Sequence, residues 1–288
     1  MSLAQSLKVA LVQVAAGADK AANLVKVKEK VTEAATKGAK LVVLPECFNS
    51  PYAVTAFPEY AETIPGGETY TFLSKLAKDS SIFLIGGSIP EKDASGKYYN
   101  TNISFNPQGE EIAKHRKVHL FDIDVPGKIK FKESDVLTAG DKATVFNLEG
   151  YGNIGLGICY DIRFPELAAI AARQHNAFAM IYPGAFNTTT GPLHWKLLGR
   201  SRATDNQLYV LMASPSRDLN SSYHAYGHSQ VIDPWGAMTA EADETEQIVY
   251  ADLEPSVIDQ VRSSVPISTQ RRFDVYADMS KNAKVSDK

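Results

Sequence analysis

The two cysteines of this chain, Cys47 and Cys159, are its strongest potential nucleophiles. Cys159 ends an apolar run over 155–158, and polar residues and the start of a helix follow it. A sharp turn from strand to helix exposes a nucleophile, and the N-terminus of a helix favours a thiolate. Gly155 and Gly157 let another element approach this strand closely. The alternative, a buried cysteine that ends a core strand, stays open on this segment alone.

A carboxylate follows a second apolar run, where residues 41–44 lead through Pro45 into Glu46. Ligand clefts of α/β folds lie at the carboxyl ends of strands, so Glu46 is a candidate for such a cleft. The alternative is a carboxylate at the surface. Cys47 comes next, and the alternation of an extended chain turns its side chain away from Glu46, which favours a packing role.

A basic cluster at 114–119 is the third candidate, because an extended chain would divide it between two faces. Lys117 and His119 then share one side, and Lys117 is expected to point inward while Arg116 points outward. The alternative is that the whole cluster is a solvated face.

The elements around these segments alternate between strands and helices, which predicts a layered α/β fold. One domain over residues 1–279 is expected, followed by a polar, flexible tail at 280–288. One helix is expected from the apolar face of Leu24, Val27, Val31 and Ala34, and others over 69–80, 165–174, 192–206 and 255–261. Strands are expected over 7–14, 41–44, 82–85, 101–105, 144–148, 153–158, 179–182, 208–213, 229–232 and 248–251.

The composition argues against several classes of partner. The net charge of the 288 residues is -3, from 30 basic and 33 acidic side chains, which gives no electrostatic case for nucleic acid or an anionic membrane. Charged residues interrupt every apolar run well short of the ~20 residues that a spanning helix needs. Two cysteines are too few for a disulfide framework, and residues 1–6 lack a signal pattern, so a cytoplasmic location is expected.

Together the three segments resemble the carbon–nitrogen hydrolase, or nitrilase, superfamily. Its signature is a Glu, a Lys and a Cys in this order, here Leu-Pro-Glu46, His-Arg-Lys117 and Gly-Ile-Cys159-Tyr-Asp. The resemblance covers the chain from Val9 to about Tyr276. It implies a four-layer α-β-β-α sandwich that dimerises through helices into an eight-layer stack.

The omega-amidase branch is the more similar part of that superfamily. The supporting stretches are PECFNSPY at 45–52, RKVHLFD at 116–122, GAFN at 184–187, TGPLHW at 190–195 and SRATDNQ at 201–207. Members of this branch release ammonia from monoamides of 2-oxodicarboxylates, such as 2-oxoglutaramate and 2-oxosuccinamate. A neighbouring branch acts on deaminated glutathione, and there a threonine is expected in place of Asn187. A non-catalytic dimeric scaffold is the alternative from another class.

An amide is a poor electrophile, so its hydrolysis needs a strong nucleophile, a proton shuttle and an oxyanion stabiliser. The resemblance assigns these roles to Cys159, to Glu46, and to Lys117 together with the backbone N–H of Tyr160. Loss of ammonia leaves a thioester on Cys159, which water activated by Glu46 then hydrolyses. No cofactor or metal is required.

The resemblance also implies a second carboxylate after the lysine motif, and Glu133 occupies that place. It would hold Lys117, which stays charged between two acids. The alternative is a surface glutamate beside Lys132. Tyr52 is expected to line the pocket entrance.

The far carboxylate of the substrate needs a cation. Arg163 is the candidate, with Phe186 and Thr190 completing this end of the pocket by resemblance, and a guanidinium suits bidentate capture of a carboxylate. The competing interpretation is an ion pair of Arg163 with Asp161 or Glu166.

Other polar and aromatic residues are expected to have structural roles. Trp195 and Trp235 are expected in packing or at an interface. His194, His224 and His228 lack the spacing of a helical metal pair, which argues against zinc.

Overall fold

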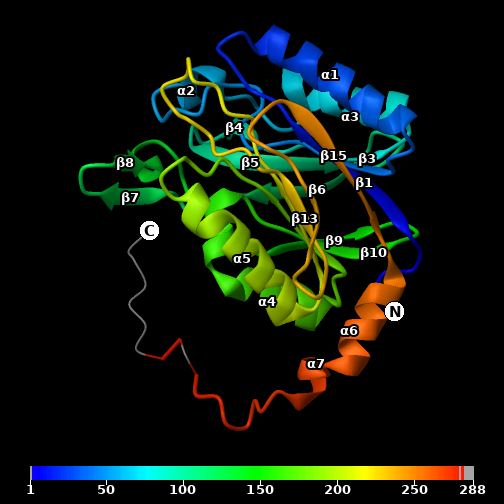
Figure 1. Ribbon diagram of the computed structural model, residues 1–288. Helices are drawn as coiled ribbons and strands as arrows, with labels where there is room; N and C mark the ends of the chain where they lie inside the picture. The colour runs from blue at the N-terminus through cyan, green and yellow to red at the C-terminus, as the bar shows by residue number, and fades with distance from the viewer. Residues whose placement is uncertain (1, 279, 282–288) are drawn as a thin grey trace.

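Two β-sheets face each other and helices cover their outer surfaces in the computed structural model, which describes residues 2–278 and 280–281 (Figure 1). Helices α1 (Lys20–Thr36) and α3 (Glu68–Ser80) pack on the first sheet. Helices α4 (Pro165–His175) and α5 (Gly191–Asn206) pack on the second. The predicted α-β-β-α sandwich is therefore confirmed.

The first sheet has seven strands, in the order β15-β1-β2-β3-β5-β4, with β6 paired to β5. Strands β1, β2 and β3 are parallel, and the other pairs are antiparallel. The carboxyl ends of the parallel strands therefore meet at one edge, where a ligand cleft is expected. The bounds are β1 Leu7–Gln13, β2 Leu41–Val43, β3 Phe83–Ile85, β4 Ile89–Lys92, β5 Tyr98–Phe105, β6 Glu111–Arg116 and β15 Gln247–Leu253.

The second sheet has six strands, in the order β14-β13-β12-β11-β10-β9. Its central strands β10, β11 and β12 are parallel. The bounds are β9 Thr144–Leu148, β10 Gly152–Leu156, β11 Ala179–Pro183, β12 Tyr209–Ala213, β13 Gln230–Ile232 and β14 Met238–Glu241. A separate hairpin, β7 (Asp122–Val125) and β8 (Ile129–Lys132), and the helices α2 (Phe57–Tyr60), α6 (Pro255–Ser264) and α7 (Ile267–Gln270) complete the fold.

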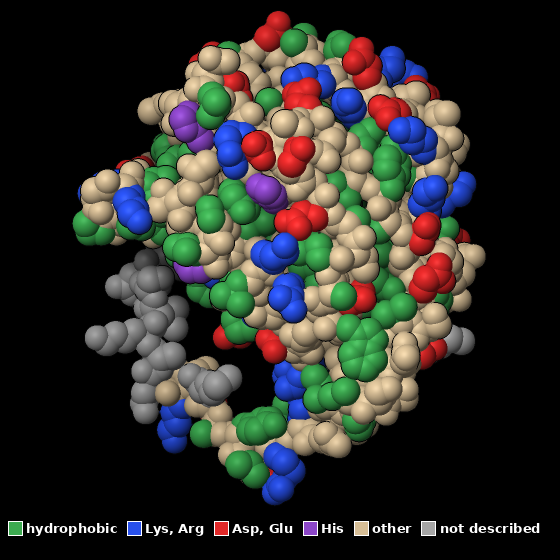
Figure 2. Space-filling view, viewed as in Figure 1, with side chains coloured by type: hydrophobic (Ala, Val, Ile, Leu, Met, Phe, Trp, Pro, Cys, Tyr) green, Lys and Arg blue, Asp and Glu red, His purple; other side chains and the backbone are tan. Residues whose placement is uncertain are grey.

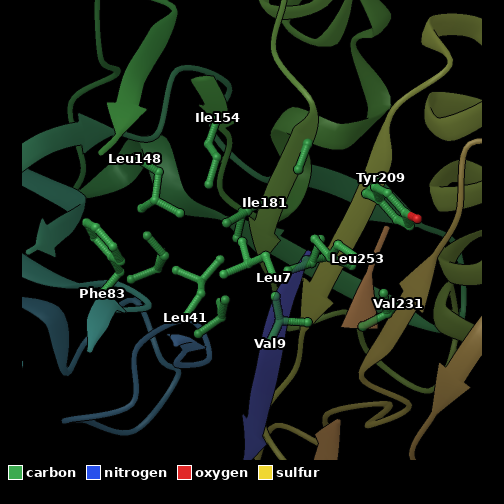
Figure 3. Close-up of a cluster of buried hydrophobic side chains, with 14 of the residues drawn as sticks. Leu7, Val9, Leu41, Phe83, Leu148, Ile154, Ile181, Tyr209, Val231 and Leu253 are labelled. Carbon is green, nitrogen blue, oxygen red and sulfur yellow. The ribbon is translucent and has the colours of Figure 1, made fainter. Parts of the chain in front are cut away.

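Side-chain alternation explains why the strands are apolar on both faces. In β1, Val9 and Leu11 point into the layer between the sheets, and Ala10 and Val12 point toward the helices. The layer between the sheets joins residues from both halves of the chain, as Figure 3 shows for Leu7 and Leu41 beside Ile181. This shared core fixes the two sheets relative to each other and thereby the loops at their edges.

The long helices agree with the sequence predictions to within three residues at each end that was predicted. The sequence did not indicate β4, β6, β7, β8 or β14, which are short and rich in polar residues. Of the tail expected at 280–288, residues 282–288 lie outside the described part of the chain. No helix among the described residues is long and apolar enough to cross a membrane.

Candidate active site

Glu46 lies in the loop after β2, and its carboxylate is buried where several segments converge. One oxygen, Oε1, accepts hydrogen bonds from Lys117 Nζ at 3.0 Å and from Asn100 Nδ2 at 2.8 Å. The other, Oε2, accepts from the backbone N–H of Ala185 at 2.7 Å. The thiol of Cys159 lies close enough to this carboxylate for each group to shift the pKa of the other. Glu46 therefore connects the two sheets at the point where both catalytic candidates lie.

Lys117 lies one residue beyond β6, and its side chain is fully buried. Its ammonium group donates to Glu46 at 3.0 Å and to Glu133 at 2.9 Å. Burial alone would lower the pKa of Lys117, but these two carboxylates raise it well above its usual range. The inward orientation predicted for Lys117 is thus observed, and the group is a permanent cation beside Glu46. Arg116 points the other way, to Glu91, at 2.6 Å.

Glu133 begins a short 3₁₀ helix directly after β8, and it is fully buried rather than a surface glutamate. Its Oε1 accepts from Lys117 Nζ and from the Tyr52 hydroxyl, each at 2.9 Å. Its Oε2 accepts from the Phe121 N–H at 2.7 Å. Tyr52 is buried and holds this carboxylate, so it contributes to the site more directly than an entrance residue does.

Cys159 follows β10 at the start of a 3₁₀ helix that spans Cys159–Arg163. Its φ is +47°, a left-handed conformation that is uncommon outside glycine. Burial raises the pKa of its thiol well above the usual range, and the negative charge of Glu46 raises it further, against the opposing effect of Lys117. The sequence prediction that a helix N-terminus favours the thiolate is therefore wrong for the resting site. A protonated thiol needs a base, and Glu46 is in contact with it.

The prediction for Cys47 was based on an extended chain, and that premise is wrong. Residues 46–49 form turns, and Cys47 has a φ of +51°. Its side chain is buried, as a packing role requires, but it lines the same cavity as Glu46. The two cysteines form no disulfide.

Arg163 ends the 3₁₀ helix that Cys159 begins. Its Nη1 lies 3.1 Å from His194 Nδ1, and its guanidinium lies 5.0 Å from the centre of the Phe186 ring. Its Nε is buried without a hydrogen-bond partner among the described residues. In that part of the chain Arg163 pairs with neither Asp161 nor Glu166, so the competing ion-pair interpretation does not hold.

Thr190 lies just before α5, where its hydroxyl and its N–H bond to Asn187 Oδ1 at 3.3 and 2.9 Å. It does not line the cavity described below. Tyr160 follows Cys159 in the same turn, with its ring 5.3 Å from that of Phe121.

A cavity of about 30 Å³ lies beside Glu46, which is room for one or two molecules the size of water. The hydroxyls of Ser50 and Ser216 line this cavity. Both are buried and have no hydrogen-bond partner among the described residues. Its lining residues are Ala15, Ala16, Glu46, Cys47, Ser50, Tyr52, Ala185, Pro215, Ser216, Asp218, Ser221, Tyr223 and Ala225.

Several residues that hold the site were not identified from the sequence. Asn100 donates to Glu46 from the middle of β5, and neither its type nor its spacing signals this. Ala185 contributes only a backbone N–H, which any residue carries. Asp161 lies in the cysteine motif, but its partners are distant in sequence.

Histidines outside this site do not form a metal centre in the described part of the chain. No group of three or more His, Cys, Asp or Glu side chains there has a metal-binding arrangement. His224 and His228 lie outside helices and strands, as the sequence predicted.

Comparisons with known proteins identify the family of this chain. Residues 8–263 match the family described as carbon–nitrogen hydrolase. The omega-amidase NIT3 of Saccharomyces cerevisiae is 55% identical over 285 residues, which cover 96% of this chain and 97% of that protein. The human omega-amidase NIT2 is 54% identical, over 94% of this chain and 97% of that protein. The crystal structure of S. cerevisiae Nit3, described as a member of branch 10 of the nitrilase superfamily, superposes with a TM-score of 0.88 at 52% identity, covering 95% of this chain and 99% of that one.

Proposed function

This chain belongs to the carbon–nitrogen hydrolase family, and from that premise we propose that it is an omega-amidase. Its reaction is hydrolysis of the terminal amide of a 2-oxodicarboxylate monoamide, such as 2-oxoglutaramate or 2-oxosuccinamate, to the 2-oxo acid and ammonia. The identity of 55% and 54% to two omega-amidases over nearly the whole chain supports this activity over others in the family.

One observation carries the catalytic assignment: Glu46, Lys117 and Glu133 form a continuous buried hydrogen-bond network, and the Cys159 thiol lies close enough to Glu46 for the carboxylate to raise its pKa. The burial of charged groups costs desolvation free energy. A buried network of charged side chains therefore points to a functional site. A sulfur, a base and a fixed cation brought together in one buried site are the set that thioester chemistry requires.

In the proposed mechanism Glu46 accepts the proton of the Cys159 thiol as the sulfur attacks the amide carbon. Lys117 and the backbone N–H of Tyr160 stabilise the oxyanion of the tetrahedral intermediate. Glu46 returns the proton to the leaving nitrogen, ammonia departs, and a thioester remains on Cys159. Water activated by Glu46 then hydrolyses the thioester, and Glu133 keeps Lys117 in place throughout.

The distal carboxylate of the substrate is assigned to Arg163. Its buried Nε without a partner among the described residues is a free donor, and Phe186 packs against the guanidinium. Thr190 is included in this subsite through the resemblance. Tyr52 is assigned to the other end of the substrate site, because it lines the cavity beside Glu46. Asn187 stands where deaminated-glutathione amidases are expected to carry threonine, which favours the smaller 2-oxo acid monoamides.

Ammonia release from 2-oxoglutaramate, deaminated glutathione and an N-carbamoyl amino acid tests the proposal directly. We expect 2-oxoglutaramate to be hydrolysed fastest and Cys159→Ala to be inactive on all three, with Cys47→Ala as the matched cysteine control that retains activity. Mass spectrometry of the protein quenched during turnover should find an acyl adduct on Cys159. Equal ammonia release by wild type and Cys159→Ala would refute Cys159 as the nucleophile, whereas no release by either protein would support a non-catalytic scaffold.

We further propose that residues 1–279 form one domain, that the protein is cytoplasmic, and that it forms a homodimer through α5. Leu193 and Leu197 on α5 are 64% and 59% exposed, and Trp235 is 42% exposed. Figure 2 shows hydrophobic side chains on the face where α5 lies in Figure 1. Large apolar side chains that are exposed together on one helix are candidates for an interface.

A further inference from the structure

The carboxylate of Asp161, two residues after the nucleophile candidate, is fully buried and surrounded by four donor groups. Its Oδ2 accepts from the Ile158 N–H at 2.9 Å and lies 3.1 Å from His115 Nε2. Its Oδ1 accepts from the N–H of His119 at 2.9 Å and lies 2.8 Å from His119 Nδ1. The mechanism proposed above uses none of these contacts.

The four contacts come from the two segments that the reaction must keep together. His115 and His119 stand two residues before and two residues after Lys117, whereas Ile158 and Asp161 flank Cys159. One carboxylate therefore links the lysine segment to the cysteine turn. Burial tends to raise the pKa of Asp161, but the hydrogen bonds of both histidines hold it well below its usual range. The group is thus an anion, and its hydrogen bonds are of the stronger, charge-assisted type.

The cysteine turn depends on restraint from its surroundings. Cys159 has a left-handed backbone conformation that a non-glycine residue adopts only where its surroundings enforce it. Lys117 lies one residue beyond β6, and its backbone is held by bonds to Asn100 at 2.9 Å and Gly140 at 2.8 Å, so the lysine segment is a fixed anchor for the cysteine turn. The ring of His119 stacks on Phe164 at 3.6 Å with an interplanar angle of 9°, which fixes the same lysine segment against the residue that follows the cysteine turn.

We propose that Asp161 is a positioning residue that holds the Lys117 ammonium and the Cys159 sulfur in their reactive arrangement. It acts through His115, His119 and the Ile158 N–H and does not touch the substrate. The proposal rests on the proposed amidase function for its kinetic consequence. Displacement of a catalytic group by about 1 Å is enough to cost on the order of 100-fold in rate.

Asp161→Asn is the first test, because it keeps the volume but replaces one acceptor oxygen with a donor that faces two donors. We expect kcat to fall at least tenfold while KM changes less than threefold. Glu62→Gln is the matched control. Glu62 is a nearly buried carboxylate that accepts from the Thr69 N–H at 2.7 Å and pairs with Lys20 at 3.1 Å, outside the site. We expect Glu62→Gln to lose thermal stability but to keep kcat.

A second readout does not depend on the amidase assignment. The rate of iodoacetamide labelling of Cys159, separated from Cys47 by peptide mass spectrometry, reports how the thiol is held beside Lys117 and Glu46. We expect Asp161→Asn to change this rate at least fivefold at a temperature where the protein is folded. A change in labelling without amidase activity in the wild type would refute the proposed function and leave the positioning role standing.

Two substitutions at the partly exposed His119 cover the case in which Asp161→Asn does not fold. His119→Phe keeps a flat ring against Phe164 but removes the Nδ1 donor, whereas His119→Asn can restore a donor at that position. We expect His119→Phe to lower kcat severalfold and His119→Asn to recover most of it. The positioning role is refuted if Asp161→Asn behaves like Glu62→Gln in kcat and labelling, or if His119→Phe and His119→Asn are equally active.

Discussion

At the scale of single residues, the thiol of Cys159 is protonated in the resting site. Burial and the charge of Glu46 raise the pKa of the Cys159 thiol, so the neutral thiol is the ground state and the carboxylate must act as base. This differs from cysteine sites that hold a preformed thiolate beside a cation. Lys117 is close enough to oppose the shift, but Glu46 and Glu133 share its charge.

The protonation state of Glu46 predicts the acid limb of the pH profile. Burial raises its pKa above the ordinary 4.5, and the charge of Glu133 adds to this against the opposing effect of Lys117. The reaction needs the ionised form, so activity is retained above the raised pKa and lost as the pH falls through it. We expect the acid limb of kcat/KM to lie above pH 4.5. Circular dichroism at each pH controls for unfolding, and a limb at or below 4.5 in the folded enzyme contradicts the assignment.

Glu133 is predicted to act through Lys117. Glu133→Gln removes one of the two charges that flank the ammonium, and we expect kcat for 2-oxoglutaramate to fall about 100-fold, the cost of displacing a catalytic group. Tyr52→Phe is the control, because it removes a hydrogen bond from an uncharged donor to the same oxygen and leaves the charge of Glu133 in place. It should cost less than about tenfold in kcat. Similar losses in both variants would argue against a role for the charge of Glu133.

Sequence reasoning found the acid, the lysine and the cysteine because each stands at the end of an apolar run or in a distinctive motif. It missed Asn100 and the partners of Asp161, because these contacts depend on how distant strands align. It also assigned the wrong resting state to Cys159, because the burial and the nearby carboxylate that set the pKa are properties of the folded site.

At the scale of elements, close packing of β10 against its neighbours sets where the cysteine turn lies. A Cβ on Gly155 would lie 2.7 Å from the Cβ of Ala171 on α4 and closer still to Met180 on β11. We expect Gly155→Ala to lower the free energy of unfolding by about 1–3 kcal/mol, measured by urea denaturation. A Cβ on Gly17 would meet no atom within 4 Å, so Gly17→Ala is the control, expected within about 0.5 kcal/mol of wild type. Equal stability of the two variants would show that β10 tolerates displacement.

The elements that the sequence revealed are those with a strong apolar period. Helix α1 was indicated by Leu24, Val27, Val31 and Ala34, all of them buried against the first sheet. The sequence did not indicate the hairpin β7–β8, because its side chains alternate only between exposed and half-buried positions and form no apolar pattern. Yet this hairpin leads directly into Glu133. An element that the sequence did not indicate therefore positions a residue that the family motif did indicate.

At the scale of the whole molecule, the four layers leave one helical face incompletely covered. Helix α5 buries Trp195, Gly199 and Arg202 against the second sheet and presents Leu193 and Leu197 outward, one turn apart. In Figure 1 the chain after α7 leaves the body of the molecule, and its Phe273, Val275 and Tyr276 are 64%, 64% and 53% exposed. The sequence gives no direct sign of this surface, because helical periodicity does not distinguish a core face from an interface.

A charge in the centre of this face should therefore separate the proposed dimer. Leu197→Glu would place a carboxylate in an apolar contact, where its desolvation is not compensated, and we expect the molar mass to shift from dimer to monomer in size-exclusion chromatography with light scattering. Val25→Glu is the matched control. Val25 is also 58% exposed but lies on α1, on the opposite outer layer, so this variant should keep the wild-type mass. A monomeric wild type would contradict the dimer itself, whereas a dimeric Leu197→Glu would place the interface on another face.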